Sequence, residues 1–415
     1  MPTTPLQVLI VGNGVVGSIL AMALQKTTPH KIIVVDAGPK DSVPIGAGVG
    51  MTPNGANALS FIDADYILTE RGCMYHGIQM GRGDTDRLLL KEATAETYSK
   101  NWGHGTYGIS RQVLVGSLRE LAEKRGIEMR FNMRLTTVEE KDKVVTARFK
   151  DGTVLTADLL FGCDGIHSVV RSYVVGEVAK PRYAGASTVV GISKLSAEDE
   201  AAANLNRNLN FWMGKGVLFG TYPSDSEGSW SWQVTWDEDP KGGESDWAKD
   251  TSLAVLIKLA SEKTASWKSR IPSIVIPKAY RAYPVGLYDR DPMNVWHRGR
   301  VVLCGDSAHP TTPFGGQGSQ MAAESAVLLA RLLGEHEEPS EEVFQKYAQL
   351  RGSRTNAVTI NARNGLNSII GIANWRFGFL LELVRDGFLY MFGPSFFRNG
   401  MRGLFAYNVA TAPLN

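Results

Sequence analysis

Cysteine is scarce in this sequence, which has three among its 415 residues: Cys73, Cys163 and Cys304. An odd number of cysteines without metal-ligand spacing favours neither a disulfide framework nor a cysteine metal site. We therefore expect a reducing compartment, with the cytoplasm as the location, and no bound metal.

An excess of one charge is also lacking, because 44 basic residues nearly balance 42 acidic ones and leave a formal charge of +2. A protein that neutralises a run of phosphates needs a basic footprint. We expect no nucleic-acid partner. The chain is long enough for two interleaved domains with cores of ordinary size.

Long uninterrupted hydrophobic runs are missing as well. The first apolar run, Leu6–Val11, is short and no basic segment precedes it, so it indicates a buried strand rather than a signal peptide. The apolar region 365–397 is interrupted by four charged residues, Arg376, Glu382, Arg385 and Asp386. We expect no transmembrane segment and a pair of amphipathic helices packed on the body, with peripheral membrane contact of this tail as the alternative.

A glycine-rich turn follows the first predicted strand. Gly12, Gly14 and Gly17 lie between that strand and a predicted helix, and Asp36 closes the next predicted strand, Lys31–Val35. Such glycines permit a tight turn, close approach of a pyrophosphate and close packing of helix on strand, while the acid can hold a ribose hydroxyl. The sequence contains one such fingerprint, so we expect one tightly bound dinucleotide and a nicotinamide partner that docks transiently.

A second motif of this kind follows the apolar run Val301–Leu303. Asp306 comes first, the turn Gly315, Gly316, Gln317 and Gly318 comes next, and a predicted helix over 319–333 completes the motif. This order places unpaired backbone N–H groups and a partial positive charge beside one carboxylate. The arrangement suits a cofactor that has a phosphate, a polyol and a flat ring.

A third element follows the predicted strand 159–162. Asp164, Ser168 and Arg171 share the pattern of a turn that opens a helix. Taken alone, the element would be interpreted as an Asp-Gly turn with Ser168 as the helix N-cap.

Together the three motifs resemble those of the single-component flavoprotein aromatic hydroxylases, the group A monooxygenases related to p-hydroxybenzoate and salicylate hydroxylases. The resemblance implies FAD as the bound cofactor. It also implies that Arg111 reaches the FAD diphosphate or ribityl chain, that the segment around Gly48 passes beside the isoalloxazine, and that Asp164 contributes to binding the flavin pyrophosphate and the pyridine nucleotide.

The same resemblance implies an α/β fold in which a Rossmann-like FAD-binding domain is interleaved with a mostly antiparallel β-sheet substrate domain, followed by C-terminal helices. We assign residues 1–75, 104–180 and 282–363 to the FAD-binding domain. Residues 76–103 and 181–281 form the substrate domain, and residues 364–415 form a helical tail.

The family's chemistry implies that NADPH or NADH reduces the flavin and that O₂ then forms a C4a-hydroperoxide. This species hydroxylates or epoxidises a small aromatic, polyketide-like or terpenoid-like substrate. The alternatives are a flavin reductase or oxidase on the same fold, or a non-catalytic carrier like the GDP-dissociation inhibitors. The intact Asp306 and Gly315–Gly318 loop argues against the carrier. The chain is expected to be a monomer or a homodimer.

A substrate site needs an apolar cover with a few polar groups. The resemblance implies Tyr222 as the candidate that contacts a phenol and accepts its proton, by alignment with strands of the family that carry such residues. The alternating face of Trp230, Trp232, Val234 and Trp236 would either cover a flat substrate or pack on a helix. His104 and His309 are expected to be structural or close to the cofactor.

Overall fold

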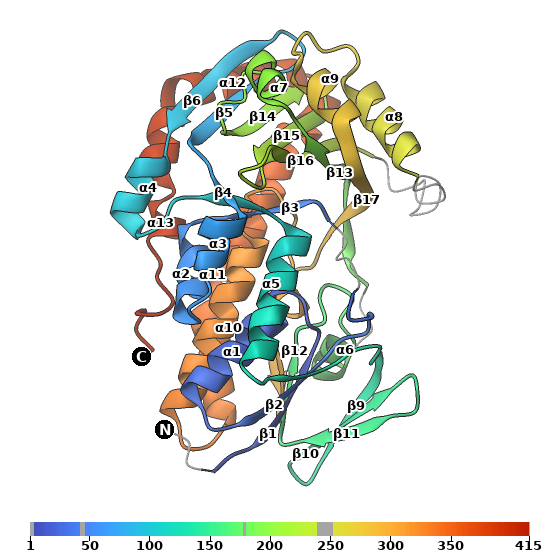
Figure 1. Ribbon diagram of the computed structural model, residues 1–415, viewed down its shortest axis with the longest axis vertical. Coiled ribbons are helices and arrows are strands. Elements are labelled where there is room, and N and C mark those ends of the chain that lie inside the picture. Colours follow the sequence, from blue (N-terminus) through green and yellow to red (C-terminus); the bar gives the residue numbers. More distant parts are fainter. Residues whose placement is uncertain (1–3, 42–45, 177–179, 239–251, 415) are drawn as a thin grey trace.

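Two large sheets at opposite ends of an elongated α/β molecule organise the fold (Figure 1). The computed structural model describes residues 4–41, 46–176, 180–238 and 252–414. The fold class expected from the sequence is confirmed, including the mostly antiparallel second sheet and the C-terminal helices.

The first sheet has six strands, which in spatial order are β18 (His297–Arg298), β19 (Val301–Leu303), β12 (Leu159–Gly162), β1 (Gln7–Val11), β2 (Lys31–Val35) and β8 (Glu128–Arg130). All neighbours are parallel except β18 and β19. Four of the five residues of β1 are buried, as expected for a continuous apolar run at the centre of a parallel sheet. The bounds of β2 and β19 are those predicted from the sequence.

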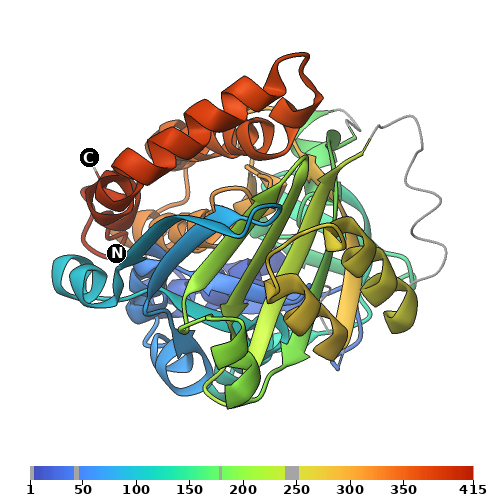
Figure 2. The same cartoon turned by 90° about the horizontal axis from the view of Figure 1, so that it is seen from above.

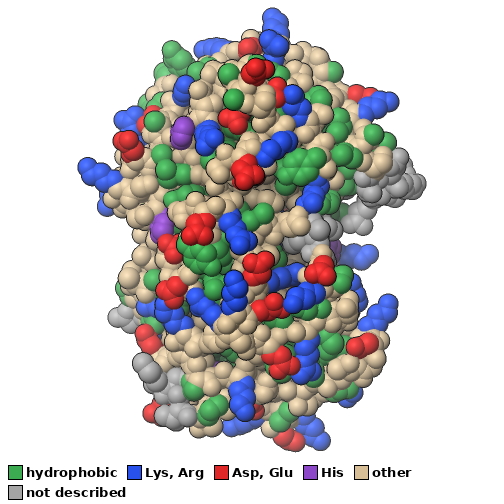
Figure 3. Space-filling model, viewed as in Figure 1, with side chains coloured by type: hydrophobic (Ala, Val, Ile, Leu, Met, Phe, Trp, Pro, Cys, Tyr) green, Lys and Arg blue, Asp and Glu red, His purple; other side chains and the backbone are tan. Residues whose placement is uncertain are grey.

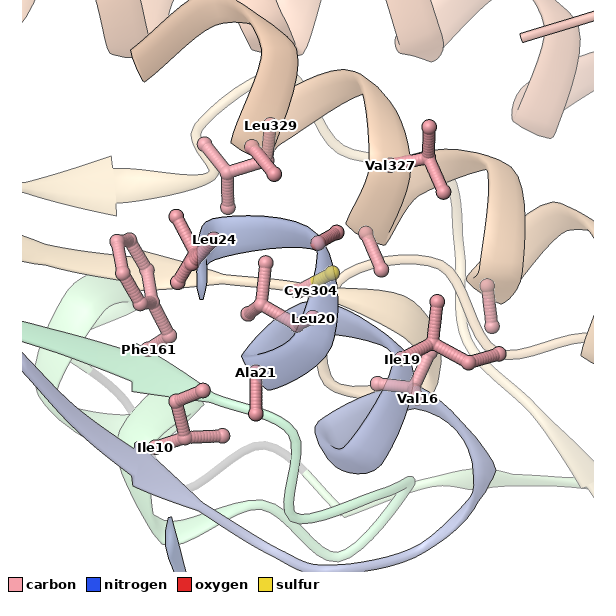
Figure 4. Close-up of a cluster of buried hydrophobic side chains, with 14 of the residues drawn as sticks. Ile10, Val16, Ile19, Leu20, Ala21, Leu24, Phe161, Cys304, Val327 and Leu329 are labelled. Atoms are coloured by element: carbon pink, nitrogen blue, oxygen red, sulfur yellow. The ribbon is translucent and has the colours of Figure 1, made fainter. Parts of the chain in front are cut away.

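Helices α1 (Val15–Thr27) and α10 (Gly318–Glu335) pack on each other and on this sheet. Figure 4 shows the resulting core, in which Leu24 of α1 lies between Phe161 of β12 and Leu329 of α10. Both helices begin at glycine-rich turns, so this core holds the two turns in fixed positions at the ends of β1 and β19.

The second sheet has seven strands. In spatial order they are β17 (Ala279–Asp289), β13 (Arg182–Lys194), β16 (Ser229–Asp237), β15 (Val217–Pro223), β14 (Leu209–Gly214), β5 (Gly77–Arg82) and β6 (Arg87–Ala93). Only β14 and β5 are parallel. Strand β17 continues past residue 281, where the proposed domain boundary lies.

Two smaller sheets complete the β structure. One contains β3 (Gly48–Met51), β7 (Tyr107–Ser110) and β4 (Cys73–Met74), and it lies between the two large sheets (Figure 1). The other, of β9 (Leu135–Lys141), β10 (Val144–Phe149) and β11 (Val154–Ala157), lies beside the six-stranded sheet, at the end of the molecule away from the seven-stranded sheet. Strand β3 contacts α10 on one side, so it connects the cofactor turns with the second sheet.

The remaining helices cover the sheets and form the tail. They are α2 (Pro53–Phe61), α3 (Tyr66–Arg71), α4 (Ala95–Trp102), α5 (Arg111–Lys124), α6 (Val169–Val175), α7 (Ala197–Ala202), α8 (Leu253–Thr264), α9 (Ile271–Val275), α11 (Glu341–Ile369), α12 (Gly378–Ser395) and α13 (Arg402–Phe405). Short helical turns are η2 (Ile276–Lys278), η3 (Gly305–Ser307), η4 (Gly371–Asn374) and η5 (Phe396–Gly400).

The described helices include none that is both long and apolar enough to cross a membrane. On the face seen in Figure 3, basic and acidic side chains are interspersed, and no large region of that face carries one sign of charge.

Candidate cofactor and substrate site

The glycine turn after β1 uses its three glycines for different purposes. Gly12 has φ +103°, and a Cβ atom there would lie 2.3 Å from the carbonyl oxygen of Cys163. A Cβ at Gly17 would lie 1.9 Å from the carbonyl oxygen of Gly12, so Gly17 permits the helix to pack on the turn. A Cβ at Gly14 would have no atom within 4 Å. The space above Gly14, at the N-terminus of α1, is therefore open to an anionic group.

Asp36 lies directly beside this turn at the end of β2. Its Oδ2 accepts a hydrogen bond from the backbone N–H of Asn13 at 2.7 Å, and its Oδ1 accepts one from the N–H of Gly38 at 2.8 Å. Arg119 of α5 lies 3.7 Å from Oδ2. The carboxylate is thus held in place by backbone groups, in the position where the fingerprint expects a ribose hydroxyl.

Asp164 has one occupied and one free carboxylate oxygen. Its Oδ2 accepts hydrogen bonds from the backbone N–H groups of Val169 and Val170, at 2.8 and 3.2 Å, at the start of α6. Its Oδ1 is buried and has no hydrogen-bond partner among the described residues. Burial raises the pKa of Asp164, although the bonds at Oδ2 oppose this.

Ser168 is the N-cap of α6, because its Oγ accepts a hydrogen bond from the N–H of Arg171. The turn interpretation is thus correct, and Oδ1 is still available to a ligand.

Arg171 fixes the loop that carries Asp306. Its guanidinium donates hydrogen bonds to the carbonyl oxygens of Ser307 and Ala308, at 2.8 and 3.0 Å. Burial, and then repulsion by Arg290, lowers the pKa of Arg171 to about 10. The arginine predicted from the third motif therefore links that motif to the second one.

Asp306 lies in η3, between the buried residues Gly305 and Ser307, and is itself exposed. Its carboxylate has no hydrogen bond or ion pair with another described residue. Desolvation of the carboxylate by the surrounding protein raises the pKa of Asp306, and the positive charge of Arg111 opposes this rise. An acceptor that is positioned but unpaired is suited to the hydroxyl groups of a polyol.

The turn after Asp306 is open at two glycines. Gly315 and Gly316 have φ of +118° and +60°, and a Cβ at either position would meet no atom within 4 Å. Backbone of this conformation favours glycine, since other residues are strained there. Gly318 begins α10, so the backbone N–H groups of this turn lie at a helix N-terminus.

Two glutamines tie this turn to the segment around β3. Gln317 donates to Thr52 Oγ1 at 3.1 Å and accepts from Asn54 Nδ2 at 3.1 Å. Gln320 donates to the carbonyl oxygens of Gly50 and Gly316, at 2.7 and 2.6 Å. Gln317 is buried, so its contacts in this structure are structural, and Gln320 is a positioning residue that the sequence analysis did not identify.

Arg111 is the first residue of α5, and its backbone N–H donates to the carbonyl oxygen of Ala47 at 2.9 Å. The side chain is exposed, and a Cβ at Gly46 would lie 3.1 Å from its Cδ. Within the described residues its guanidinium has no hydrogen bond or ion pair. A free guanidinium close enough to affect Asp306 suits a diphosphate.

Gly48 of β3 faces two hydroxyl groups from the second sheet. A Cβ at Gly48 would lie 2.8 Å from Tyr222 Oη and 2.3 Å from Ser231 Oγ. The ring of Tyr75 is 5.8 Å from that of Tyr222, measured between centroids. The hydroxyl oxygens of Tyr75 and Ser231 are buried without a hydrogen-bond partner among the described residues. We call Tyr75, Tyr222 and Ser231 the hydroxyl cluster.

Burial raises the pKa of Tyr222 well above its usual value, and the nearby Ser231 hydroxyl opposes this only in part. Burial likewise raises the pKa of Tyr75. Both phenols are therefore protonated at neutral pH. A neutral phenol can donate a hydrogen bond to a substrate oxygen, and the role of Tyr222 as a proton acceptor stays a prediction.

The tryptophan face of β16 does not cover this cluster. Trp230, Trp232, Val234 and Trp236 are all buried in one core with residues of α8 and α9, such as Leu256 and Val275. The helix-packing alternative is therefore the correct one. Ser231 is on the opposite face of the same strand, because successive side chains alternate.

The two candidate histidines are structural in the observed contacts. His309 is buried, its Nε2 lies 2.9 Å from Ser325 Oγ, and burial lowers its pKa to about 3. His104 Nε2 lies 3.0 Å from Ser60 Oγ.

A buried network of charged side chains lies next to the glycine turn 315–318. Glu324 of α10 accepts hydrogen bonds from Arg351 at 2.7 Å, from Arg354 at 2.9 Å and from Asn54 Nδ2 at 2.6 Å. Because Asn54 also donates to Gln317, the network connects α11 to the glycine turn. The sequence analysis did not identify Glu324, the buried acid of this network.

These residues fit FAD, because the motifs present open glycine backbone, a free oxygen on Asp164, and the unpaired Asp306 and Arg111. A family of proteins described as having an FAD binding domain matches this chain over residues 5–362. The chain is 30% identical over 358 residues to 3-hydroxybenzoate 6-hydroxylase 1 of Aquipseudomonas alcaligenes, covering 86% of this chain and 87% of the relative. It is 29% identical over 366 residues to 3-amino-4-hydroxybenzoate 2-monooxygenase PtmB3 of Streptomyces platensis, again covering 86% and 87%.

Among solved structures, Klebsiella pneumoniae HpxO in complex with FAD and uric acid superposes with a TM-score of 0.82 at 22% identity, covering 99% of this chain and 98% of that one. A salicylate hydroxylase substrate complex gives a TM-score of 0.74 at 20% identity, covering 99% and 98%. The chain belongs to the FAD binding domain family, and it is an FAD-dependent monooxygenase of the aromatic hydroxylase group.

Proposed function

We propose that this protein uses NADH or NADPH and O₂ to hydroxylate, or epoxidise, a small, flat aromatic molecule that carries a phenolic or carbonyl oxygen. The hydroxyl cluster is the observation that carries this proposal. Two of its three hydroxyl groups are buried without a partner, and an unsatisfied buried polar group is costly unless a ligand or water completes it. Three neutral hydroxyls suit an oxygen on the substrate, and relatives named for hydroxybenzoates and salicylate support an aromatic compound.

The cofactor residues keep the roles that their geometry supports. Gly12, Gly14 and Gly17 would admit the pyrophosphate at the start of α1, and Asp36 would hold the adenosine ribose. Arg111 and Asp164 would bind the diphosphate region, and Asp306 would bind the ribityl hydroxyls. Gly315, Gly316, Gln317 and Gly318 would place backbone N–H groups at the flavin, with the segment of Gly48 beside its ring. When bound, FAD supplies the transfer of electrons and the activation of O₂.

The chain's own residues would orient the substrate and exclude water. Tyr222 stays protonated and would donate a hydrogen bond to the substrate oxygen, while Ser231 and Tyr75 would complete the set of polar contacts. Strand β3 connects the two halves of the site: Gly48 faces the hydroxyl cluster, and the carbonyl of Gly50 binds Gln320 beside the flavin turn. Displacing β3 would therefore affect the cofactor and the substrate together.

We also propose the domain division given above, with the second boundary moved from 281 to the end of β17 at Asp289 because that strand is hydrogen-bonded within the seven-stranded sheet. Cys73, Cys163 and Cys304 are free, which supports the cytoplasm as the proposed location.

The function is tested by adding NADH or NADPH anaerobically to the FAD-loaded protein and following flavin absorbance, with and without phenols, hydroxybenzoates, indoles and polyketide-like aromatics. We expect one class of aromatic compound to accelerate bleaching. Reduction that no aromatic compound affects would favour the reductase or oxidase alternative, and bound flavin that is never reduced would contradict catalysis by this protein.

A further inference from the structure

Helix α12 is built with its charged side toward the protein. Arg82 of β5 pairs with Glu382 at 2.9 Å and with Asp386 at 3.4 Å, and Arg385 pairs with Asp386 at 2.8 Å. These four charged side chains are only 11–13% exposed. Further along the helix, Gly393 packs against Leu90 of β6. Ionic contacts and one glycine thus attach α12 to the second sheet.

The outward side of the helix is apolar instead. Residues that are at least 38% exposed there, or in the segments on either side, are Trp375, Phe377, Phe379, Leu380, Leu381, Leu383, Val384, Phe388, Tyr390, Met391, Phe392 and Phe396. Val384 and Met391 are 70% and 66% exposed. A surface helix of a soluble body shows the reverse polarity, so this concentration indicates an apolar neighbour outside the fold.

The width of this surface distinguishes a membrane from a second copy of the chain. At about 100° per residue, the exposed apolar positions from Phe379 to Phe392 cover roughly 220° of the helix circumference. A facing helix would cover a stripe only about 100° wide and leave the rest in water. Figure 2 shows α12 as the outermost helix on its side of the molecule, accessible from more than one direction. A fluid bilayer surface can enclose all of these side chains.

The charges around the surface favour an anionic bilayer. Arg376 and Arg87 are both exposed, and they lie over the rings of Phe377 and Tyr390 at 5.5 and 5.8 Å. The acids of α12, Glu382 and Asp386, face inward and are already paired. Two acids of the β5–β6 turn, Asp84 and Asp86, lie near Arg87 in sequence, and Asp84 pairs with Arg82. Aromatic rings with adjacent arginines are suited to the headgroup region.

We propose that the surface formed by the exposed apolar side chains of Trp375–Phe396 docks this enzyme on anionic lipid membranes, with α12 lying in the plane of the interface. Its depth is limited to the interface because the inner side carries the ion pairs with Arg82. The enzyme would thus act beside the membrane without spanning it.

The test is flotation of the FAD-loaded protein with phosphatidylcholine vesicles prepared with and without phosphatidylglycerol. The double variant Leu383→Gln/Val384→Gln removes two of the most exposed apolar side chains without changing the charge. Its matched control is Val154→Gln/Val295→Gln, which alters two valines that are 47% and 55% exposed outside the tail. A second pair of variants compares Arg376→Gln with Lys150→Gln. Lys150 is an exposed residue in the turn between β10 and β11, away from the tail.

We expect the wild type and both controls to float with vesicles that contain phosphatidylglycerol. The tail double variant should lose about tenfold or more of its vesicle partitioning. Arg376→Gln should lose about fivefold, and only when phosphatidylglycerol is present. Turnover without vesicles should be unchanged in all variants, which shows that they are folded.

Absence of vesicle binding by the wild type, or equal binding by the tail double variant and its control, would overturn the proposal. So would a concentration-dependent dimer, measured by sedimentation equilibrium, that the double variant abolishes in a protein that does not bind vesicles. That result would assign the surface to a second copy of the chain.

Discussion

Gly14 and Gly17 provide a sharp test of the cofactor site, because the same substitution should have different effects at the two positions. In Gly17→Ala the new Cβ would lie 1.9 Å from the carbonyl oxygen and 3.0 Å from the carbonyl carbon of Gly12. Both atoms belong to the backbone, so no side-chain rotation relieves the contact. Overpacking typically costs about 1–3 kcal/mol, and a backbone clash should reach at least the upper end of that range.

Gly14→Ala should leave the apoprotein nearly as stable as the wild type. Gly14 has φ −82° and its Cβ would meet no atom within 4 Å. Alanine is a poorer N-cap than glycine, which destabilises the folded state by about 0.5 kcal/mol. Alanine also reduces the conformational entropy of the unfolded chain, which stabilises the fold by about the same amount. The added methyl group would instead occupy the space proposed for the pyrophosphate. We expect FAD affinity to fall at least tenfold, about 1.4 kcal/mol.

Two measurements separate the effects: thermal unfolding of the apoproteins, and titration of the apoproteins with FAD by flavin fluorescence. Gly116→Ala in α5 is the matched control, because its Cβ also meets no atom within 4 Å. Gly17→Ala should lower the apo Tm by about 3 °C or more, whereas Gly14→Ala and the control should not. Wild-type FAD affinity in Gly14→Ala, or an unchanged apo Tm in Gly17→Ala, would refute the reasoning.

Four further predictions follow from the site. Asp306→Ala should lower flavin occupancy after purification, and full retention of FAD would contradict the assignment of this residue. Tyr222→Phe should retain flavin but lower kcat by about ten- to a hundredfold, since it removes the proposed donor to the substrate; unchanged kcat and KM would contradict that role. Glu324→Gln should lower the free energy of unfolding in urea by about 3–5 kcal/mol, because Arg351 and Arg354 lose their buried partner. A loss below about 1 kcal/mol, the value of an exposed ion pair, would contradict the importance of the network. Burial lowers the pKa of His309 to about 3 in the folded protein, whereas an unfolded histidine has a pKa of about 6.5. As the pH falls below about 6.5, protons therefore bind the unfolded state preferentially and lower the free energy of unfolding. Between pH 6.5 and 4.5 the wild type should therefore lose about 2 kcal/mol more than His309→Gln, and parallel pH profiles would contradict this explanation.

The cofactor motifs could be predicted from sequence because their geometry is local. Gly12 and Gly17 face each other across one turn, and Asp36 ends the next strand, so spacing alone places them together. The same is true of Ser168 as an N-cap. Only the free Oδ1 of Asp164, which depends on how the whole loop is buried, required the structure.

The hydroxyl cluster could not be predicted in this way, since its members come from different strands and connections. Alternation along β16 shows that Trp230 and Trp232 share one face, but it does not show which neighbour covers that face. The structure places α8 and α9 there, so the proposed substrate side is the opposite one, which carries Ser231. Tyr222 was found by alignment with strands of the family, and Ser231 is opposite it in the neighbouring strand β16. Tyr75 is far from both in sequence, so its place beside Tyr222 depends on the tertiary fold.

One signal in the sequence was not used, and a second was used only in part. Glu324 is a single acid inside an otherwise apolar helical stretch, which is a pattern typical of a buried and paired charge. In α12, the charged residues Glu382, Arg385 and Asp386 repeat at helical spacing within an apolar segment. That spacing predicts one charged face, but only the contact with Arg82 shows that this face is turned toward the protein.

The central claim, that this protein inserts oxygen from O₂ into an aromatic substrate, is tested most directly by turnover under ¹⁸O₂ with the compound that most accelerates flavin reduction. We predict a product that carries a single ¹⁸O atom, formed in step with NAD(P)H consumption. Unlabelled product, or consumption of NAD(P)H that yields only hydrogen peroxide for every compound tested, would contradict the claim.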